Sequence, residues 1–253
     1  MHEGVFGPGS WNPLARALLA YARGDSEALL NVLVDDGDAD PLPVSLFFRA
    51  PSELRDVDRV AVSRAQGHVL DLGAGAGSIS LALQERGFRV TAVEIIPDLV
   101  RIMKERGVKD VRQGSVEDLP ESLSFDTILI LMNGIAMAGS FSRVPAFLRG
   151  LGRHLRKGGQ ILLDSTDLLE GEGRMPTYRD DLPPGWYEGD YPGEVHYQLE
   201  FRGEKGSPFP QVFLDPATLA ILAKEEGFHA EVVWRGEDGA FLARLGKEAG
   251  LGP

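Results

Sequence analysis

The sequence predicts an α/β fold in which helices cover both faces of a doubly wound, seven-stranded and mostly parallel sheet. Three observations support this fold class. From residue 69 onward, short apolar runs alternate with helical patterns, as consecutive strand–helix units require. A glycine-rich turn at residues 73–77 joins the first of these runs to a helical pattern. Residues 125–131 are nearly all apolar, which is typical of a central strand covered on both faces.

Seven strands follow from this alternation, at residues 69–72, 89–94, 108–113, 125–131, 160–164, 230–234 and 240–245. Helices are expected between them at residues 78–83, 98–106, 144–156 and 216–226. Pro97 stands near the start of the second helix and Gly107 follows its end, as helix termini favour. The last helix has Asp215 as its N-cap and stops at Gly227. The last two strands meet across a short glycine-containing loop, so the final strand is expected to be antiparallel.

Two regions fall outside this rhythm. Residues 1–60 form an N-terminal extension or cap, with a helix near residues 14–21 and an irregular acidic stretch at 35–43. Residues 61–253 form the main domain, which carries an insertion at residues 165–214 on the side where a substrate enters. The insertion ends in two extended runs, residues 195–202 and 209–214, separated by a glycine-containing hairpin connection.

Charge and composition exclude several classes of protein. The net charge of −12 argues against a nucleic-acid partner, since phosphate binding depends on Lys and Arg. The absence of Cys excludes disulfides and cysteine-based zinc sites, and no metal site is expected. No apolar run approaches the length of a membrane span and no signal peptide is evident, so a cytoplasmic protein without a membrane partner is expected.

The turn at residues 73–77 indicates a ligand-binding site. Gly73, Gly75 and Gly77, with Ala74 between them, allow backbone N–H groups to approach a ligand closely. A dinucleotide site would place its last small residue one position later, where Ser78 stands. Asp71, at the carboxyl end of the preceding strand, suits a cationic ligand better than a pyrophosphate.

Glu94 is the second diagnostic residue. It ends the second strand, 17 residues after Gly77, and ribose-binding acids lie about 20 residues downstream of such turns. A carboxylate can accept hydrogen bonds from both vicinal hydroxyls of a ribose. The alternative is a solvated charge at a strand end.

Asp71 and the three glycines resemble motif I of the class I, Rossmann-like S-adenosylmethionine-dependent methyltransferases. The resemblance implies S-adenosyl-L-methionine as cofactor and S-adenosyl-L-homocysteine as product. Residues 113–120 look like the loop of this family that passes the adenine ring, although Ser115 stands where Asp is common. The resemblance therefore assigns cofactor contacts, besides those already named, to Ile95, Ser115, Val116, Glu117, Met132 and Asn133. For Asn133, an ordinary turn role remains an equal alternative.

Residues 40–245 are similar to an uncharacterised bacterial group within that family, sharing the Met-Asn-Gly-Ile stretch at 132–135. This similarity implies the fold and the cofactor and does not identify the methyl acceptor. A small molecule is expected, and a homodimer is left open. Candidate acceptor contacts are Phe48, Arg49, Asp164 and Tyr187, while Tyr191 and His196 are the candidate general bases for a hydroxyl acceptor. For each of these residues, a core or surface role is the competing interpretation.

The predicted reaction is direct displacement of the cofactor's methyl group by an N, O or C nucleophile. Two alternatives differ in class. One is a non-catalytic module that binds S-adenosylmethionine or S-adenosylhomocysteine, or serves as a partner subunit. The other is an NAD(P)-dependent oxidoreductase, against which Ser78 and Asp71 both argue.

Overall fold

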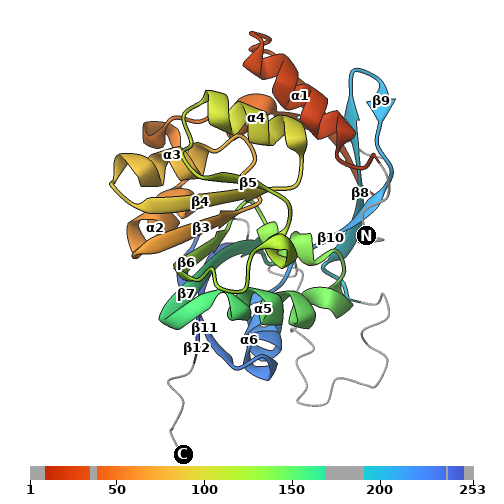
Figure 1. Cartoon of the computed structure of the whole chain (residues 1–253). Coiled ribbons are helices and arrows are strands. Elements are labelled where there is room, and N and C mark those ends of the chain that lie inside the picture. The colour runs from red at the N-terminus through yellow and green to blue at the C-terminus, as the bar shows by residue number, and fades with distance from the viewer. Residues whose placement is uncertain (1–8, 35–38, 169–190, 238, 248–253) are drawn as a thin grey trace, which may run out of the picture.

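The computed structural model describes residues 9–34, 39–168, 191–237 and 239–247. Within them, the chain builds two sheets (Figure 1). The larger has seven strands in the order β11-β12-β7-β6-β3-β4-β5. Its strands are β3 (His68–Leu72), β4 (Arg89–Glu94), β5 (Val111–Gln113), β6 (Phe125–Ile130), β7 (Leu155–Thr166), β11 (Phe228–Arg235) and β12 (Ala240–Lys247).

The direction of these strands confirms the predicted fold class. Strands β7, β6, β3, β4 and β5 run parallel to one another. Strand β12 is antiparallel to β7, and β11 is antiparallel to β12. The reversal of strand order falls between β3 and β6, where ligands bind in open sheets of this kind because the connections leave on opposite faces.

Helices cover both faces of this sheet. The helices are α1 (Asn12–Ala22), α2 (Asp56–Arg64), α3 (Ser78–Glu85), α4 (Pro97–Glu105), α5 (Val144–Arg153) and α6 (Pro216–Glu225). Because side chains alternate along a strand, Val69 packs on the side of α2 and α3, whereas Leu70 packs on the side of α5 and α6. Helix α2 was not anticipated. None of the helices in the described ranges is long and apolar enough to cross a membrane.

The second sheet joins the N-terminal extension to the insertion, two regions that lie far apart in the sequence. Strands β1 (Leu29–Val34) and β2 (Ala39–Pro43) come from the N-terminal extension. They pair with β8 (Glu194–Phe201), which in turn pairs with β9 (Glu204–Lys205) and β10 (Phe209–Val212). The expectation of an irregular stretch through residue 43 was therefore wrong for residues 39–43. Antiparallel pairing with the preceding strand β1 forms a strand there despite the two prolines of β2, which lie on an edge strand.

An apolar cluster fixes this second sheet against the main domain. Leu18 of α1, Leu30 of β1, Leu99 of α4 and Leu199 of β8 share it, and all are nearly inaccessible to water. Figure 1 shows α1 lying between α4 and the strand β8. This packing brings the N-terminal extension beside the carboxyl ends of the parallel strands.

The helix expected at residues 144–156 ends earlier, at Arg153, and β7 already begins at Leu155. Leu155 pairs with Phe125, and the register then shifts so that Gln160 pairs with Thr127. Gly158 lies in this irregular stretch with φ +78°, and a Cβ on Gly159 would come within 3.0 Å of two backbone oxygens. The glycines thus form a bulge in the strand and do not end the helix.

Candidate functional site

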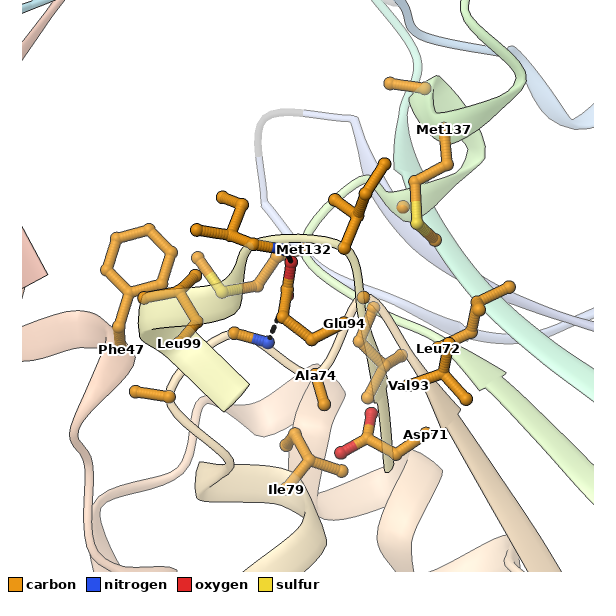
Figure 2. Close-up of a pocket in the computed structure, with 18 of the residues that line it drawn as sticks. Phe47, Asp71, Leu72, Ala74, Ile79, Val93, Glu94, Leu99, Met132 and Met137 are labelled. Carbon is orange, nitrogen blue, oxygen red and sulfur yellow. Dashed lines mark hydrogen bonds between the residues drawn. The ribbon is translucent and has the colours of Figure 1, made fainter. Parts of the chain in front are cut away.

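A cavity of about 320 Å³ opens at the carboxyl ends of β3, β4 and β6. Its lining comes from the glycine turn, the ends of these strands and the N-terminal extension. Figure 2 shows Asp71 and Glu94 rising from neighbouring strands, with Phe47 on one side and Met137 on the other. This is the crevice in which the predicted cofactor residues were expected to meet.

The glycine turn forms the floor of the cavity. Gly73, Gly75 and Gly77 have φ values of +70°, +57° and +86°, a region that side-chain-bearing residues rarely adopt. A Cβ on Gly73 would lie 2.9 Å from the sulfur of Met137, and one on Gly77 would meet two side chains at 2.9 Å. Gly73 and Gly75 line the cavity, whereas Gly77 is not among its described lining residues and faces the core. The turn therefore requires glycine for its backbone conformation, and at Gly73 and Gly77 also because a Cβ would clash.

Glu94 is connected directly to this turn. One carboxylate oxygen accepts the amide of Gly75 at 2.9 Å, and the other accepts the amide of Ile96 at 3.0 Å. Burial raises the pKa of Glu94, and the hydrogen bonds from Ile96 and Gly75 partly oppose that rise. Ile95, the next residue, is 60% exposed and lines the cavity. An apolar side chain held open to a cavity is suited to cover a flat ring.

Asp71 lines the cavity although its residue is only 3% exposed. Its carboxylate accepts a hydrogen bond from the Ser80 hydroxyl at 2.6 Å. Burial raises its pKa to about 6; the Ser80 hydrogen bonds oppose the rise, and the nearby carboxylates of Glu94 and Asp58 add to it. A cation in the cavity would favour the ionised form of this group.

The loop after β5 also reaches the cavity through Ser115, Val116 and Glu117. The Ser115 hydroxyl donates to the Asp118 carboxylate at 2.8 Å, and the Ser115 amide does so at the same distance. These bonds cap the short 3-10 helix that follows, so the hydroxyl has a structural partner. Val116 is buried and Glu117 is exposed, which leaves the Glu117 carboxylate accessible to a ligand.

The chain leaves β6 through an unusual turn. Met132 and Asn133 both have positive φ, +61° and +55°, although neither is glycine. The Asn133 side chain donates to the carbonyl of Val212 at 3.0 Å and accepts the Ser165 hydroxyl at 3.0 Å. Asn133 lines the cavity with its amide directed to these protein partners, whereas Met132 is 38% exposed there. Such backbone strain is found chiefly at functional sites.

Among the described residues that line the cavity, Arg49 is the only one with a basic side chain. Its Nη2 lies 3.4 Å from the Asp58 carboxylate, and its Nε is buried without a hydrogen-bond partner in the described part of the chain. Burial lowers its pKa, while the charge of Asp58 counteracts that effect. A buried guanidinium with an unsatisfied N–H is suited to receive an anionic ligand atom.

Other predicted acceptor contacts lie elsewhere. Asp164 does not appear among the described lining residues. Its carboxylate oxygens accept hydrogen bonds from the Arg55 guanidinium at 3.1 Å and from the backbone N–H of Asn133 at 2.8 Å. Phe48 stacks on Tyr21 at 4.6 Å between ring centroids and lies beneath Arg106, outside the cavity. Tyr187 lies outside the described residues.

The structure places neither proposed general base in the cavity. Tyr191 is 3% exposed, stacks on Phe141, and donates its hydroxyl to the Asp215 carboxylate at 2.9 Å. Burial and the charge of Asp215 raise the pKa of Tyr191 further, so its hydroxyl stays protonated near neutral pH and cannot take a proton from an acceptor. His196 is exposed on β8 and is not among the described lining residues. Packing in the core accounts for Tyr191, which sequence alone could not separate from an active-site tyrosine.

Several lining residues were not anticipated. They come from five separate elements, and what they share is an apolar or amide side chain at the cavity: Trp11, Leu14, Leu46, Met137, Phe147 and Gln211. No local pattern marks them. Only the second sheet and the helix contacts bring these segments together.

The residues present fit a nucleoside cofactor with a cationic amino-acid portion. The glycine cradle leaves room that a Cβ would fill, Glu94 offers carboxylate oxygens, Asp71 favours a cation, and Arg49 has an unsatisfied donor. The ribose of such a ligand would supply hydroxyls to Glu94, and its amino-acid portion would supply an ammonium to Asp71 and a carboxylate to Arg49. The cavity thus matches the ligand class expected from the glycine turn.

Comparison with known proteins agrees with this geometry. The family described as "Methyltransferase domain" matches residues 69–159. A SAM-dependent methyltransferase from Bacteroides fragilis, solved in complex with S-adenosyl-L-homocysteine, is 35% identical with a TM-score of 0.80, over 95% of this chain and 96% of that one.

The matches to two curated relatives span a smaller share of each relative's length. A cypemycin N-terminal methyltransferase from Streptomyces sp is 40% identical over 167 residues, which are 62% of this chain and 67% of the relative. A ubiquinone biosynthesis O-methyltransferase from Xylella fastidiosa (strain M23) is 36% identical over 185 residues, which are 69% of this chain and 65% of the relative.

Proposed function

This chain belongs to the S-adenosylmethionine-dependent methyltransferases, and from that premise we propose how it holds the cofactor and what receives the methyl group. The cofactor is S-adenosyl-L-methionine, and the fold is that of the class I enzymes. The acceptor we propose is a small molecule with an apolar body and an amine nitrogen as its nucleophile. The observation that carries this is the apolar wall beside a cavity whose ionisable groups are mostly carboxylates.

The adenosine part lies between the ends of β4 and β5. Glu94 accepts the ribose hydroxyls, because its carboxylate lines the cavity at the position of a ribose-binding acid. Ile95 and Val116 cover the faces of the adenine ring, and Glu117 accepts from its amino group. The exposed position of Ile95 and Glu117 at the cavity supports this arrangement.

The amino-acid part of the cofactor lies over the glycine turn. Its ammonium faces Asp71 and its carboxylate faces Arg49, since these two side chains supply opposite charges to the lining of the cavity. The unsatisfied Nε of Arg49 supports the second contact. Both interactions fix the direction in which the methyl group points.

When bound, S-adenosylmethionine supplies an electrophilic methyl carbon and leaves as S-adenosylhomocysteine. The acceptor ammonium first loses a proton to water, which frees the nitrogen lone pair. The lone pair then forms the bond to the methyl carbon, the carbon–sulfur electrons return to sulfur, and the product nitrogen keeps its two remaining protons as a methylated ammonium. In-line positioning of nucleophile and methyl group provides most of the rate. The protein's own part is to orient both molecules and to exclude water from the reacting atoms.

The acceptor enters beside the residues that the cofactor does not use. Trp11, Leu14 and Phe47 form one apolar side of this space, and Met137 and Phe147 form another. Gln211 of β10 adds an amide that can hydrogen-bond a polar group of the acceptor. Burial of an aromatic or aliphatic body against these walls supplies about 25 cal/mol for each Å² removed from water.

Charge favours an amine as the nucleophile. Among the described lining residues, Asp58, Asp71, Glu94 and Glu117 are acidic, against Arg49 alone. Such a cavity attracts cationic molecules and disfavours anions. The name of the cypemycin N-terminal methyltransferase, which acts on an amino terminus, supports the same class. A phenolic hydroxyl is the second candidate, supported by the name of the ubiquinone biosynthesis O-methyltransferase.

A release assay for S-adenosylhomocysteine tests the proposal directly. Small aromatic and aliphatic primary amines are compared with phenols of matched size, at saturating S-adenosylmethionine. We expect turnover with amines and at least a ten-fold lower kcat/KM with the phenols. Preference for phenols would replace the first candidate by the second. Tight cofactor binding without turnover on either series would favour the non-catalytic alternative.

A further inference from the structure

We propose that Asp164 is a positioning residue with two roles. Through Arg55 and Asp58 it fixes the orientation of the Arg49 guanidinium. Through the backbone N–H of Asn133 it holds the turn at residues 132–133. Asp164 lies outside the cavity lining among the described residues, so it acts through its neighbours. The inference rests on the proposed placement of the cofactor carboxylate at Arg49.

A continuous chain of ion pairs runs from β7 to the cavity. One oxygen of Asp164 lies 3.1 Å from Nη2 of Arg55. Arg55 grips both oxygens of Asp58, through Nη2 at 2.6 Å and Nε at 2.9 Å. Asp58 in turn lies 3.4 Å from Nη2 of Arg49. The bidentate grip fixes the Asp58 carboxylate in direction as well as in distance.

Burial makes this chain stiff. The side chains of Asp58, Asp164 and Arg49 are 1%, 9% and 11% exposed, so water offers them few alternative partners. Two carboxylates and two guanidiniums balance one another in charge. Although burial alone lowers the pKa of Arg55, hydrogen bonding to Asp58 and the charge of Asp164 raise it overall. Removing one member takes a partner from its neighbour, and losing the partner of a buried charge costs more than losing that of an exposed one.

The second oxygen of Asp164 holds the Met132–Asn133 turn, which also lines the cavity. It accepts the backbone N–H of Asn133, the residue that follows Met132, at 2.8 Å. Met132 and Asn133 occupy the left-handed region at φ +61° and +55°, which costs free energy for residues other than glycine. The turn persists because surrounding contacts, this hydrogen bond among them, compensate for the strain. One carboxylate therefore touches both the strained turn and the ion-pair chain.

The orientation of Arg49 matters because its partners are few. Asp58 engages Nη2, and the buried Nε points to no acceptor in the described residues. A ligand carboxylate can then be received by the remaining N–H groups of the same guanidinium. If the ion-pair chain relaxes, Arg49 loses its direction and this part of the ligand loses its contact.

The test compares two ligands that differ by the amino-acid portion. S-adenosylhomocysteine carries it, whereas 5′-methylthioadenosine keeps the adenosine and thioether and lacks it. We expect Asp164→Asn to weaken S-adenosylhomocysteine about ten-fold in calorimetry, the order of one lost charge-assisted contact. Binding of 5′-methylthioadenosine should change less than about two-fold. Arg55→Gln should give the same pattern.

These two variants change the local charge in opposite directions. A purely long-range electrostatic effect would strengthen binding of the ligand carboxylate in Asp164→Asn and weaken it in Arg55→Gln. Loss of positioning weakens it in both. Glu226→Gln, which breaks the remote Arg149–Glu226 pair, is the matched control and should leave both ligands unaffected. Because the Arg55 side chain is 36% exposed, Arg55→Gln keeps the test available if Asp164→Asn does not fold.

The outcomes separate the two proposals. Equal weakening of both ligands, or opposite effects of the two variants on S-adenosylhomocysteine, would overturn the positioning role. Unchanged binding in both variants would do the same. If the unaltered protein bound 5′-methylthioadenosine as tightly as S-adenosylhomocysteine, the Arg49 contact in the proposed function would fail instead.

Discussion

The carboxylate of Glu94 accepts the backbone amide of Gly75 at 2.9 Å, so the acid that ends β4 is joined directly to the glycine turn that follows β3. The same side chain also accepts the Ile96 amide. These bonds hold the carboxylate within the cavity before any ligand arrives. A preorganised acceptor loses less conformational entropy on binding than a free side chain does.

Replacing Glu94 by Ala should weaken binding of S-adenosylmethionine and S-adenosylhomocysteine by about 1–3 kcal/mol, the range for hydrogen bonds to a charged group. Glu94→Gln keeps the size of the side chain but loses its charge, and should fall between Ala and the native residue. Isothermal calorimetry measures both. Native affinity in Glu94→Ala would remove this residue from the cofactor site.

Affinity for S-adenosylmethionine should fall as the pH decreases through about 6, because Asp71 has a pKa of about 6 in the free protein. Protonation removes the charge that faces the cofactor's ammonium, so binding below this pH must first release a proton. Titrations between about pH 5 and 8 measure the slope. Asp71→Asn should bind more weakly at pH 7 and lose this slope; an unaltered slope in the variant would assign the titration to another group.

The same carboxylate should make the free protein less stable at neutral pH. Its pKa is raised from 3.8 to about 6, so ionisation is easier in the unfolded chain. The free energy of unfolding therefore falls as the pH rises between these two values, by up to about 3 kcal/mol. Asp71→Asn should be more stable than the native chain at pH 7 and not at pH 3.5. Chemical denaturation at the two pH values decides this.

Gly73→Ala should lower both stability and cofactor affinity. The new Cβ would meet the sulfur of Met137 at 2.9 Å and would force an alanine to φ +70°. Gly87→Ala is a matched control, because Gly87 has φ +83° with nothing within 4 Å of the added atom. The control should lose only about 1 kcal/mol of stability and none of its affinity. Equal ligand affinity for both variants would show that the turn tolerates a side chain.

Tyr191→Phe should act on stability alone. The change removes the hydrogen bond that the hydroxyl donates to the Asp215 carboxylate and the one that it accepts from the Asp215 backbone amide, which costs about 1–3 kcal/mol, and leaves the stacking on Phe141. Affinity for S-adenosylhomocysteine and the pH profile of turnover should match the native enzyme. A displaced pH profile in this variant would restore Tyr191 as a candidate base.

Much of the donor side of the reaction could be predicted from the sequence because its signals are local. A strand, a turn with three glycines and a helix occupy adjacent residues, and their conformations depend on the backbone freedom of Gly73, Gly75 and Gly77. The seven-stranded, mostly parallel sheet and the cofactor class were confirmed for the same reason. The end of α5 was misplaced, since Gly158 and Gly159 serve a strand bulge that depends on pairing with β6.

The acceptor side depended on contacts between distant segments. The second sheet joins residues of the N-terminal extension to strands β8 and β10, with Asn31 opposite Glu200. No local pattern encodes such pairing, because an apolar strand can pair in many registers until packing selects one. Tyr191 illustrates the consequence: its sequence context suited a base, and its burial beside Asp215 gives it a structural role.

By itself, the sequence determined the sheet, the glycine turn and the two acids, Asp71 and Glu94, that line the cavity, since each follows from residue types at short spacing. Only the tertiary structure decided that Arg49 reaches the cavity and that Asp164 stands behind it, 109 residues from Arg55. Ion pairs and apolar walls of this kind depend on burial and distance, which exist only once the chain has folded.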